Sequence, residues 1–242
     1  MVSLPSQSAW LQGLAAAVPS RCAVCGAWPA RPVCDACIAR FGAPRTRCLR
    51  CALPLAAGQP VCGACLTQPP PLATCHAAVD YAYPWSGLLA RFKFQGEPGW
   101  AGPLAALMRA APDLADAIAQ ADAVVPLPLA PARLAERGFN QALELARRLA
   151  PDRTRTQWLV RLRETPAQAR LDLAARAANV RGAFAVEPLR HADVRGLRVL
   201  LVDDVMTSGA SLHAAALALQ AAGALSVSAA VFARTPDPPG GD

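Results

Sequence analysis

Short apolar segments alternate with amphipathic ones along the last two-thirds of this 242-residue chain. The apolar segments have the length of strands, and the amphipathic ones repeat their apolar positions with a helical period. Strands are predicted at 77–83, 123–127, 157–162, 197–202 and 225–233, and helices at 87–94, 103–110, 113–120, 138–149 and 208–221. Apolar strands that alternate with helices predict an α/β fold with a mainly parallel sheet.

The first third of the chain has a different pattern, with few large apolar residues and all nine cysteines of the protein. Eight of these cysteines form four CxxC pairs, and this spacing lets two thiolates face one metal ion. The sequence therefore predicts two structural zinc sites in a double zinc ribbon. Two pairings fit the spacing: a sequential one, and a cross-braced one that joins the first pair to the third and the second to the fourth. The predicted ligands are Cys22, Cys25, Cys34, Cys37, Cys48, Cys51, Cys62 and Cys65.

Disulfides are the competing interpretation of these cysteines. No convincing secretory signal precedes them, because the apolar patch at 10–18 lacks a positively charged start. Zinc is therefore favoured, and four thiolates would fill each metal shell, which makes catalysis at zinc improbable. The ninth cysteine, Cys75, is interpreted as a packed thiol.

The proline-rich segment 68–71 marks a domain boundary, since prolines form a stiff spacer. Residues 205–233 contain no Asp, Glu, Lys or Arg, but glycines and serines interrupt them, so a buried helix and strand are predicted without membrane insertion. The expected organisation is an N-terminal segment at 1–21, a double zinc ribbon at 22–68, an α/β domain at 77–235 and a flexible tail at 236–242.

Charge and aromatic content bear on the kind of ligand. The formal net charge is +7, which suits phosphate-rich ligands or nucleic acid without distinguishing them. Lys93 is the only lysine among 24 basic residues, which singles it out for inspection. Aromatic residues make up only 5% of the chain, whereas grooves for single-stranded nucleic acid normally add aromatic stacking platforms.

The segment from Val199 to Ser211 connects most directly to chemistry. An apolar strand ends in Asp203 and Asp204, and Thr207, Ser208, Gly209, Ala210 and Ser211 lead into a helix. Small residues let backbone N–H groups approach a phosphate, and the helix N-terminus adds unpaired donors. Carboxylates at the carboxyl end of a strand can accept hydrogen bonds from ribose hydroxyls. An ordinary strand end followed by a helix cap would favour some of the same residue types.

This segment resembles the signature of type I phosphoribosyltransferases, which bind phosphoribosyl pyrophosphate (PRPP). Further segments resemble the ComF family: 125–128 with Arg133 and 136–141, 161–168 with Arg176, and 91–94. Together with the four CxxC pairs, the resemblance covers residues 22–235 in the order of the family.

The resemblance implies that Asp203 and Asp204 hold the ribose as catalytic residues and that 207–211 hold its 5′-phosphate. It also implies Mg²⁺ with PRPP and a role in DNA uptake on the cytoplasmic side, with a helicase partner. The alternative is a non-catalytic PRPP sensor or a single-stranded-DNA-binding protein. No residue identifies the acceptor substrate. Candidates for pyrophosphate or motif contacts are Lys93, Arg133, Arg137, Arg161, Arg163, Gln168 and Arg176.

Overall fold

The computed structural model describes residues 20–162 and 182–236. The chain divides into two compact units, 1–43 and 44–242, and each is described by itself. Three candidate contact residues, Arg163, Gln168 and Arg176, lie outside the described residues, as do 1–19 and 237–242 of the expected terminal segments.

The smaller unit consists of a turn and one short helix. An antiparallel bridge joins Ser20 to Ala30, and α2 (Asp35–Phe41) begins directly after Cys34. Two CxxC pairs therefore lie in the turn and at the start of the helix. The only helix residue that is buried is Cys37, so this unit has almost no apolar core of its own.

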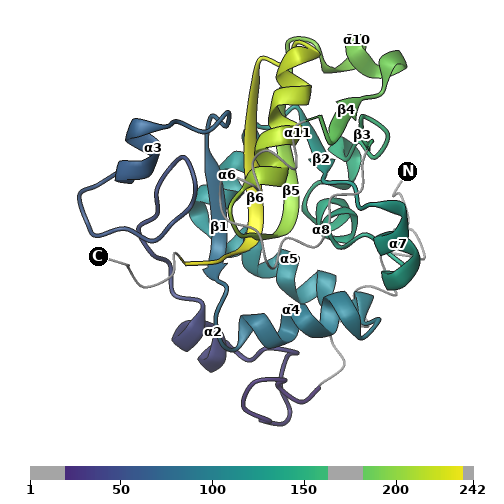
Figure 1. Cartoon of the computed structure of the whole chain (residues 1–242). Coiled ribbons are helices and arrows are strands. Elements are labelled where there is room, and N and C mark those ends of the chain that lie inside the picture. The colour runs from purple at the N-terminus through teal and green to yellow at the C-terminus, as the bar shows by residue number, and fades with distance from the viewer. Residues whose placement is uncertain (1–19, 163–181, 237–242) are drawn as a thin grey trace, which may run out of the picture. The chain divides into compact units, whose positions relative to one another are not determined.

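A four-stranded parallel sheet forms the centre of the larger unit (Figure 1). Its strand order is β1-β6-β5-β2, and every neighbouring pair is parallel. Most residues of these strands are buried, as expected for a parallel sheet that is covered on both faces. The fold is therefore mixed α/β with a parallel sheet, as predicted. The strands are β1 (Cys75–Asp80), β2 (Ala123–Pro126), β5 (Arg198–Met206) and β6 (Ser226–Arg234).

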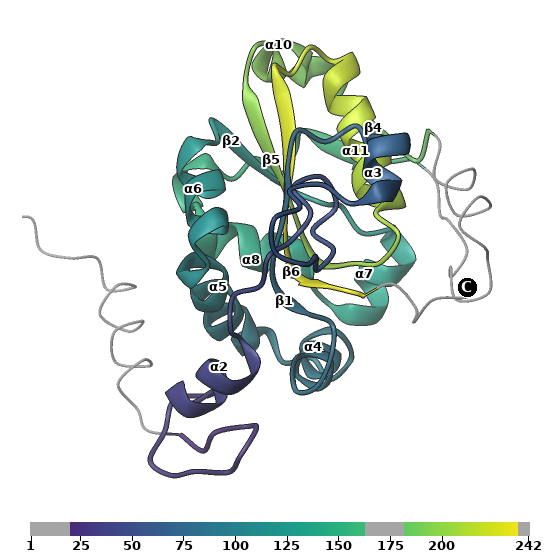
Figure 2. The same ribbon diagram turned by 90° about the vertical axis from the view of Figure 1, so that its left-hand side faces the viewer.

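Helices cover both faces of this sheet (Figure 2). One face carries α5 (Ala101–Ala110), α6 (Pro112–Gln120) and α8 (Gln141–Leu149), and the other carries α11 (Ala210–Ala221). The unit also contains α3 (Gly63–Thr67), α4 (Trp85–Phe94), α7 (Pro131–Arg137) and α10 (His191–Val194), with 3-10 turns at Pro98–Trp100, Pro151–Arg153 and Pro188–Arg190.

The second half of the cysteine-rich region belongs to the larger unit. Cys48, Cys51, Cys62 and Cys65 are buried in the same apolar cluster as Leu72, the sheet and α11. The compact units divide after Ala43, whereas the sequence indicated a boundary at the prolines of 68–71. The prolines come directly after the last CxxC pair in the sequence, but the buried side chains of residues 48–65 pack in the same apolar cluster as the sheet.

Two segments differ from the sequence expectation for local reasons. The predicted helix at 138–149 begins later, as α8 at Gln141, because Gly138, with φ +76°, ends the preceding helix α7 and Asn140 caps α8 by accepting a hydrogen bond from the Leu143 N–H. The predicted strand at 157–162 is β3 (Leu159–Arg161), and it pairs antiparallel with β4 (Phe184–Val186) in a separate sheet. The sequence analysis missed both α7 and β4.

The uncharged stretch 205–233 holds α11 and most of β6, as predicted. Both elements bury most of their apolar residues against the rest of the unit. Within the described ranges, no helix combines the length and the apolar character that crossing a membrane requires.

Candidate functional site

The two acids predicted to bind ribose lie near the carboxyl end of β5. Asp204 is buried, with 5% of its surface exposed, and Asp203 is half-buried. The Asp204 N–H donates a hydrogen bond of 2.8 Å to Oδ1 of Asp203, which fixes the first carboxylate against the backbone. The site therefore presents two acids from consecutive positions of one strand, where ligands bind in open α/β sheets.

Lys93 supplies the countercharge of this pair. Its Nζ lies 2.9 Å from Oδ1 of Asp204, and both side chains are largely shielded from water. The position of Lys93 follows from α4, whose buried stripe includes Leu89 and Phe92. The Phe92 ring packs 5.5 Å from the ring of Phe139, which anchors the helix beside the segment before α8. The single lysine of the chain thus reaches the acid pair from a distant part of the sequence.

The two carboxylates are electrostatically unequal. Burial, followed by the negative charge of Asp204, raises the pKa of Asp203 to about 7, although Lys93 and Arg137 oppose this shift. One ammonium group therefore faces two acids, and ionisation of both leaves a net negative charge. A site with this charge and these acceptors suits a ligand with hydroxyl donors or an added cation.

Arg137 extends the site along the end of α7. Its Nη1 donates to Oε1 of Gln141 at 3.0 Å, and its guanidinium carbon lies 5.2 Å from the ring centre of Phe94. Gln141 is only 1% exposed. Two buried donors, Nε of Arg137 and Nε2 of Gln141, have no hydrogen-bond partner among the described residues. Each could donate to a ligand oxygen, so Gln141, which the sequence alone did not place among the site residues, joins the candidates.

The loop after β5 has the form expected of a phosphate cradle. Gly209 adopts φ +78° and is the N-cap of α11. A Cβ at this position would lie 2.4 Å from Cε of Met206 and 2.8 Å from Nε2 of His213, so both the backbone conformation and the space favour glycine. Thr207 is exposed, while Ser208, Ala210 and Ser211 are half-buried at the start of the helix. The first N–H groups of α11 lack intrahelical partners and can face an anion.

The remaining described arginine candidates lie on other elements. Arg133 is half-buried on α7, a helix with no buried residue. Arg161 is on β3 in the small sheet, and its guanidinium carbon lies 5.3 Å from the ring centre of Phe184 on β4. The structure thus brings Lys93 and Arg137 to the acid pair and places Arg133 and Arg161 on neighbouring secondary structure.

The eight paired cysteines form two separate groups in sequential order. In each group the four Sγ atoms lie within 4.8 Å of one another, with separations of 3.9 Å for Cys22 and Cys37 and 3.7 Å for Cys51 and Cys62. A tetrahedral shell with Zn–S bonds of about 2.3 Å has sulfur–sulfur edges of about 3.8 Å, whereas a disulfide bond is about 2.05 Å long. Both groups therefore fit zinc, and the grouping is sequential rather than cross-braced.

The two groups repeat the same local geometry. The residue after the second cysteine is left-handed in each, Gly26 with φ +76° and Ala52 with φ +58°. The third cysteine of each group donates its N–H to the sulfur of the first, at 3.4 Å from Cys34 to Cys22 and at 3.3 Å from Cys62 to Cys48. Such bonds to sulfur are the outer-shell contacts that orient thiolate ligands.

Backbone hydrogen bonds lower the pKa of one thiol in each group. Burial opposes thiolate formation in Cys22 and Cys48, but backbone N–H donors outweigh it and lower the pKa to about 6 and about 7, respectively. Burial raises the pKa of Cys37 and Cys51 to about 12. The fold thus favours the thiolate of Cys22 in one group and of Cys48 in the other, and a bound divalent cation would favour deprotonation of Cys37 and Cys51.

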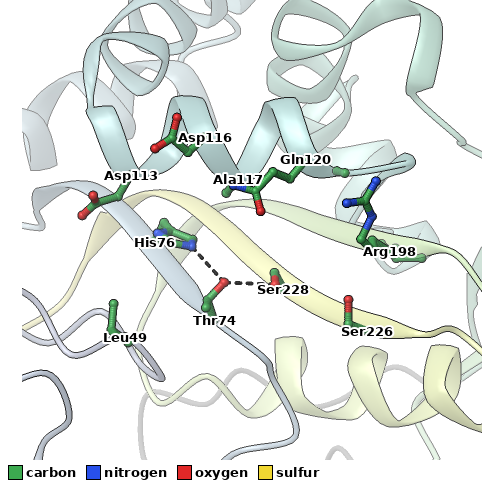
Figure 3. A pocket seen from close by; sticks show the side chains of 12 residues that line it. Leu49, Thr74, His76, Asp113, Asp116, Ala117, Gln120, Arg198, Ser226 and Ser228 are labelled. Carbon is green, nitrogen blue, oxygen red and sulfur yellow. Dashed lines mark hydrogen bonds between the residues drawn. The ribbon is translucent and has the colours of Figure 1, made fainter.

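A hollow of about 280 Å³ lies at the opposite, amino end of the sheet, under α6 (Figure 3). Its floor contains a hydrogen-bonded row in which Thr74 Oγ1 lies 2.9 Å from His76 Nε2 and 3.0 Å from Ser228 Oγ. Arg198 at its rim is already paired with Asp122 at 2.8 Å. This hollow is therefore distinct from the acid pair and has no phosphate-binding loop.

Strand, acid pair and glycine turn together define a phosphoribosyltransferase-type domain. The family model described as phosphoribosyl transferase domain matches residues 134–240, which include β5, the loop and α11. Lys93 lies before this match.

Comparison with known proteins narrows the class. The chain is 32% identical over 209 residues to DNA utilization protein YhgH of Salmonella typhimurium, covering 84% of this chain and 90% of that protein. It is 31% identical over 231 residues to the Escherichia coli K12 protein of the same name, covering 90% and 98%. It is also 32% identical over 164 residues to Competence protein F of Haemophilus influenzae, covering 63% and 69%. The chain belongs to the ComF family.

Proposed function

We propose that this protein binds PRPP in a Mg²⁺-dependent manner at the end of β5 and acts in DNA uptake or utilisation. One observation carries the proposal most directly. Asp204, which is buried and paired with Lys93, and the half-buried Asp203 lie in the strand that leads into a left-handed glycine turn. This combination provides acceptors for a diol and donors for a phosphate within one strand–loop–helix segment.

Each residue has a separate part in this proposal. Asp203 and Asp204 accept hydrogen bonds from the ribose hydroxyls, and the backbone N–H groups of 207–211 hold the 5′-phosphate. Lys93, Arg137 and Gln141 offer positive charge or free donors on the side of the acid pair, which suits the pyrophosphate. Asp203 is the acid best placed to hold Mg²⁺, because its carboxylate lacks a direct ammonium partner among the described residues. When bound, Mg²⁺ would neutralise pyrophosphate oxygens.

The chemistry that such a site supports is displacement of pyrophosphate from the anomeric carbon. The bond between the anomeric carbon and the pyrophosphate oxygen breaks as the acceptor atom forms its own bond to that carbon. Charge that develops on the ribose ring is stabilised by the nearby carboxylates, and charge on the leaving group is stabilised by Lys93 and Arg137. Catalysis would consist of positioning and electrostatics, and the acceptor remains to be identified by experiment.

Zinc has a structural role in this proposal. Four thiolates complete the shell in each cysteine group, which leaves no position for substrate. The smaller unit buries little apolar surface, so metal binding would supply much of its folding free energy.

The role in DNA uptake rests on the relatives, whose names refer to DNA utilization and competence. A second candidate function, direct binding of single-stranded DNA, has limited support in the aromatic residues. Trp85, Phe92 and Trp100 are buried, whereas Phe94 is 65% exposed beside Arg137. Among the aromatic residues within 85–100, only Phe94 is thus exposed, and one ring next to a guanidinium can stack one base without forming an extended platform.

Calorimetric titration of PRPP with Mg²⁺ into the zinc-loaded chain tests the PRPP proposal. The matched control is Asp203→Asn/Asp204→Asn, which keeps side-chain size and removes both charges. Saturable binding that requires Mg²⁺ and disappears in this variant supports the site. Absence of binding to the unmodified chain would refute it.

A labelled oligonucleotide tests the DNA alternative on the same samples. Anisotropy measured between 50 and 200 mM salt should show a steep loss of affinity if phosphate contacts dominate, by about 10³-fold or more for six contacts. Affinity that survives Asp203→Asn/Asp204→Asn and falls in Phe94→Ala would place DNA at this surface independently of PRPP.

A further inference from the structure

Arg234, at the end of β6, is one of three polar or charged residues buried in the described part of the chain, with 5% of its surface exposed. Its Nε donates a hydrogen bond of 2.9 Å to the carbonyl of Cys51. Its Nη1 lies 3.4 Å from the carbonyl of Met206 and also contacts the carbonyl of Thr235. One guanidinium thus joins a residue of the second cysteine group to the last residue of β5.

The Cys51 carbonyl is aimed by the turn of the cysteine group. The Cys51–Ala52 peptide is oriented in part by the φ angle of Ala52, which is +58° in a residue with no exposed surface. Two hydrogen bonds hold this turn, from the Ala52 N–H to the Cys48 carbonyl at 2.8 Å and from the Cys48 N–H to the Leu53 carbonyl at 2.8 Å. A left-handed backbone is unfavourable for alanine, so the surroundings must maintain it. Four sulfurs at zinc-like separations would maintain it when they share one metal ion.

Met206 is the other end of the connection and directly precedes the phosphate loop. Its carbonyl also accepts the Thr235 N–H at 3.0 Å, and its sulfur lies 3.4 Å from the Cys75 sulfur. Its methyl group occupies the space that a side chain at position 209 would need. A displacement of Met206 would therefore change the backbone that precedes Gly209 and the first turn of α11.

Electrostatics supports the same connection. A zinc ion with four thiolates carries a net charge of −2, and a buried guanidinium nearby offsets part of it. Two other arginines bond carbonyls around this group, Arg47 to Ala52 at 3.1 Å and Arg50 to Leu72 at 2.8 Å. Of these three arginines, only Arg234 also bonds the carbonyl of Met206.

We propose that Arg234 is a positioning residue through which metal binding at the second cysteine group sets the phosphate loop for PRPP. This inference rests on the proposed PRPP site. Metal at Cys48, Cys51, Cys62 and Cys65 fixes the Cys51 carbonyl, the carbonyl holds Arg234, and Arg234 holds Met206. Because binding equilibria are linked reciprocally, PRPP must also tighten metal binding at this group by the same factor.

The test compares Arg234→Met with Arg50→Met in the full-length, zinc-loaded chain. Arg50 is the matched control, because it bonds carbonyls beside the same cysteine group without touching Met206. Zinc content must stay at two ions per chain in both variants. PRPP affinity is expected to fall about tenfold in Arg234→Met, within the usual range of site coupling, and to stay unchanged in Arg50→Met.

Two further readouts separate this inference from the PRPP proposal. Amide hydrogen exchange in 206–211 without ligand should be faster in Arg234→Met than in the unmodified chain or Arg50→Met, whether or not PRPP binds. Zinc affinity, measured by equilibrium competition with a chelator of known affinity, should rise about tenfold with saturating PRPP and Mg²⁺ in the unmodified chain, and this effect should vanish in Arg234→Met. The affinity change is assigned to the second group with Cys34→Ser/Cys37→Ser, which disables the first.

Unchanged exchange in 206–211 in the zinc-loaded Arg234→Met variant would overturn the coupling. So would a PRPP-dependent rise in zinc affinity that persists in that variant. If the unmodified chain binds no PRPP, the proposed function fails, and exchange in 206–211 still decides the coupling: removal of zinc should speed it in the unmodified chain and change it little in Arg234→Met.

Discussion

Lys93 on α4 and Asp204 on β5 form an ion pair of 2.9 Å, although 111 positions separate them in the sequence. Asp204 is buried, whereas its neighbour Asp203 is only half-buried, so the Asp203 carboxylate is accessible to a ligand. The pair explains why the only lysine in an arginine-rich chain occurs at this position. A compact ammonium group can neutralise one buried carboxylate without the planar geometry that a guanidinium needs.

Replacing Lys93 by methionine is expected to destabilise the fold, because it leaves a buried carboxylate without its partner. The expected loss is about 3 kcal/mol in the free energy of unfolding, measured with urea. The double variant Lys93→Met/Asp204→Asn removes both charges and should recover most of that loss while still failing to bind PRPP. A single variant as stable as the unmodified chain would show that the pair contributes nothing to the fold.

Asp203 should make stability depend on pH. Its folded-state pKa of about 7 exceeds the unfolded value of about 3.9, so the folded protein binds the extra proton between these limits. Stability from this group therefore falls as pH rises from 4 to 7. In thermal melting without ligand, the melting temperature of Asp203→Asn relative to that of the unmodified chain should rise as pH increases from 5 to 8. The exposed Asp152→Asn serves as the control, and parallel melting curves for all three proteins would contradict the assignment.

Gly209→Ala should disable the phosphate loop. The added methyl would lie 2.4 Å from Met206 and would occupy a backbone conformation with φ +78°. We expect at least tenfold weaker PRPP binding and a stability loss of about 1–3 kcal/mol. Gly196→Ala is the matched control, because Gly196 has φ +76° with open space around it, ahead of β5. Gly196→Ala should reduce stability by backbone strain alone and leave PRPP affinity unchanged. Equal losses of PRPP affinity in both variants would contradict a specific role of the Gly209 loop in binding.

Gly26→Ala should weaken metal binding by the first cysteine group. Gly26 has φ +76° and no atom near the position of a Cβ, so the cost is backbone strain of about 1 kcal/mol. Gly63→Ala in the second group lacks a left-handed backbone and also has open space, and it should leave zinc affinity nearly unchanged. Competition with a chelator of known affinity measures both. Equal zinc affinity in Gly26→Ala and the unmodified chain would show that the turn is not maintained by the metal shell.

Local patterns predicted much of this structure. The parallel sheet, the helix and strand within 205–233, and the turn at Gly209 follow from periodicity and from small residues at a strand end. The cysteine spacing predicted two metal-binding groups, although the sequential pairing needed the coordinates. Strand β4 was not predicted, because it has only three residues and its pairing with β3 is a tertiary contact.

The contacts of the candidate site depend on long-range packing that a single sequence does not reveal. Composition and the ComF-like segment 91–94 indicated Lys93, but its partner Asp204 follows only from the folded structure, in which the two form an ion pair. The sequence does mark Arg234, because it is the first charged residue after the uncharged stretch 205–233. A charge that ends a buried strand needs partners, and here the partners are the carbonyls of Cys51 and Met206.

The most direct test of the PRPP site is hydrogen exchange across the whole chain with and without PRPP and Mg²⁺, because it locates the ligand without assuming turnover. The account predicts protection in 203–211 and no protection in the lining of the amino-end hollow, 113–121 and 226–228. The Asp203→Asn/Asp204→Asn variant should show no ligand-dependent change. Protection confined to the hollow, or no protection anywhere at saturating PRPP, would contradict the assignment of the acid pair and glycine loop as the PRPP site.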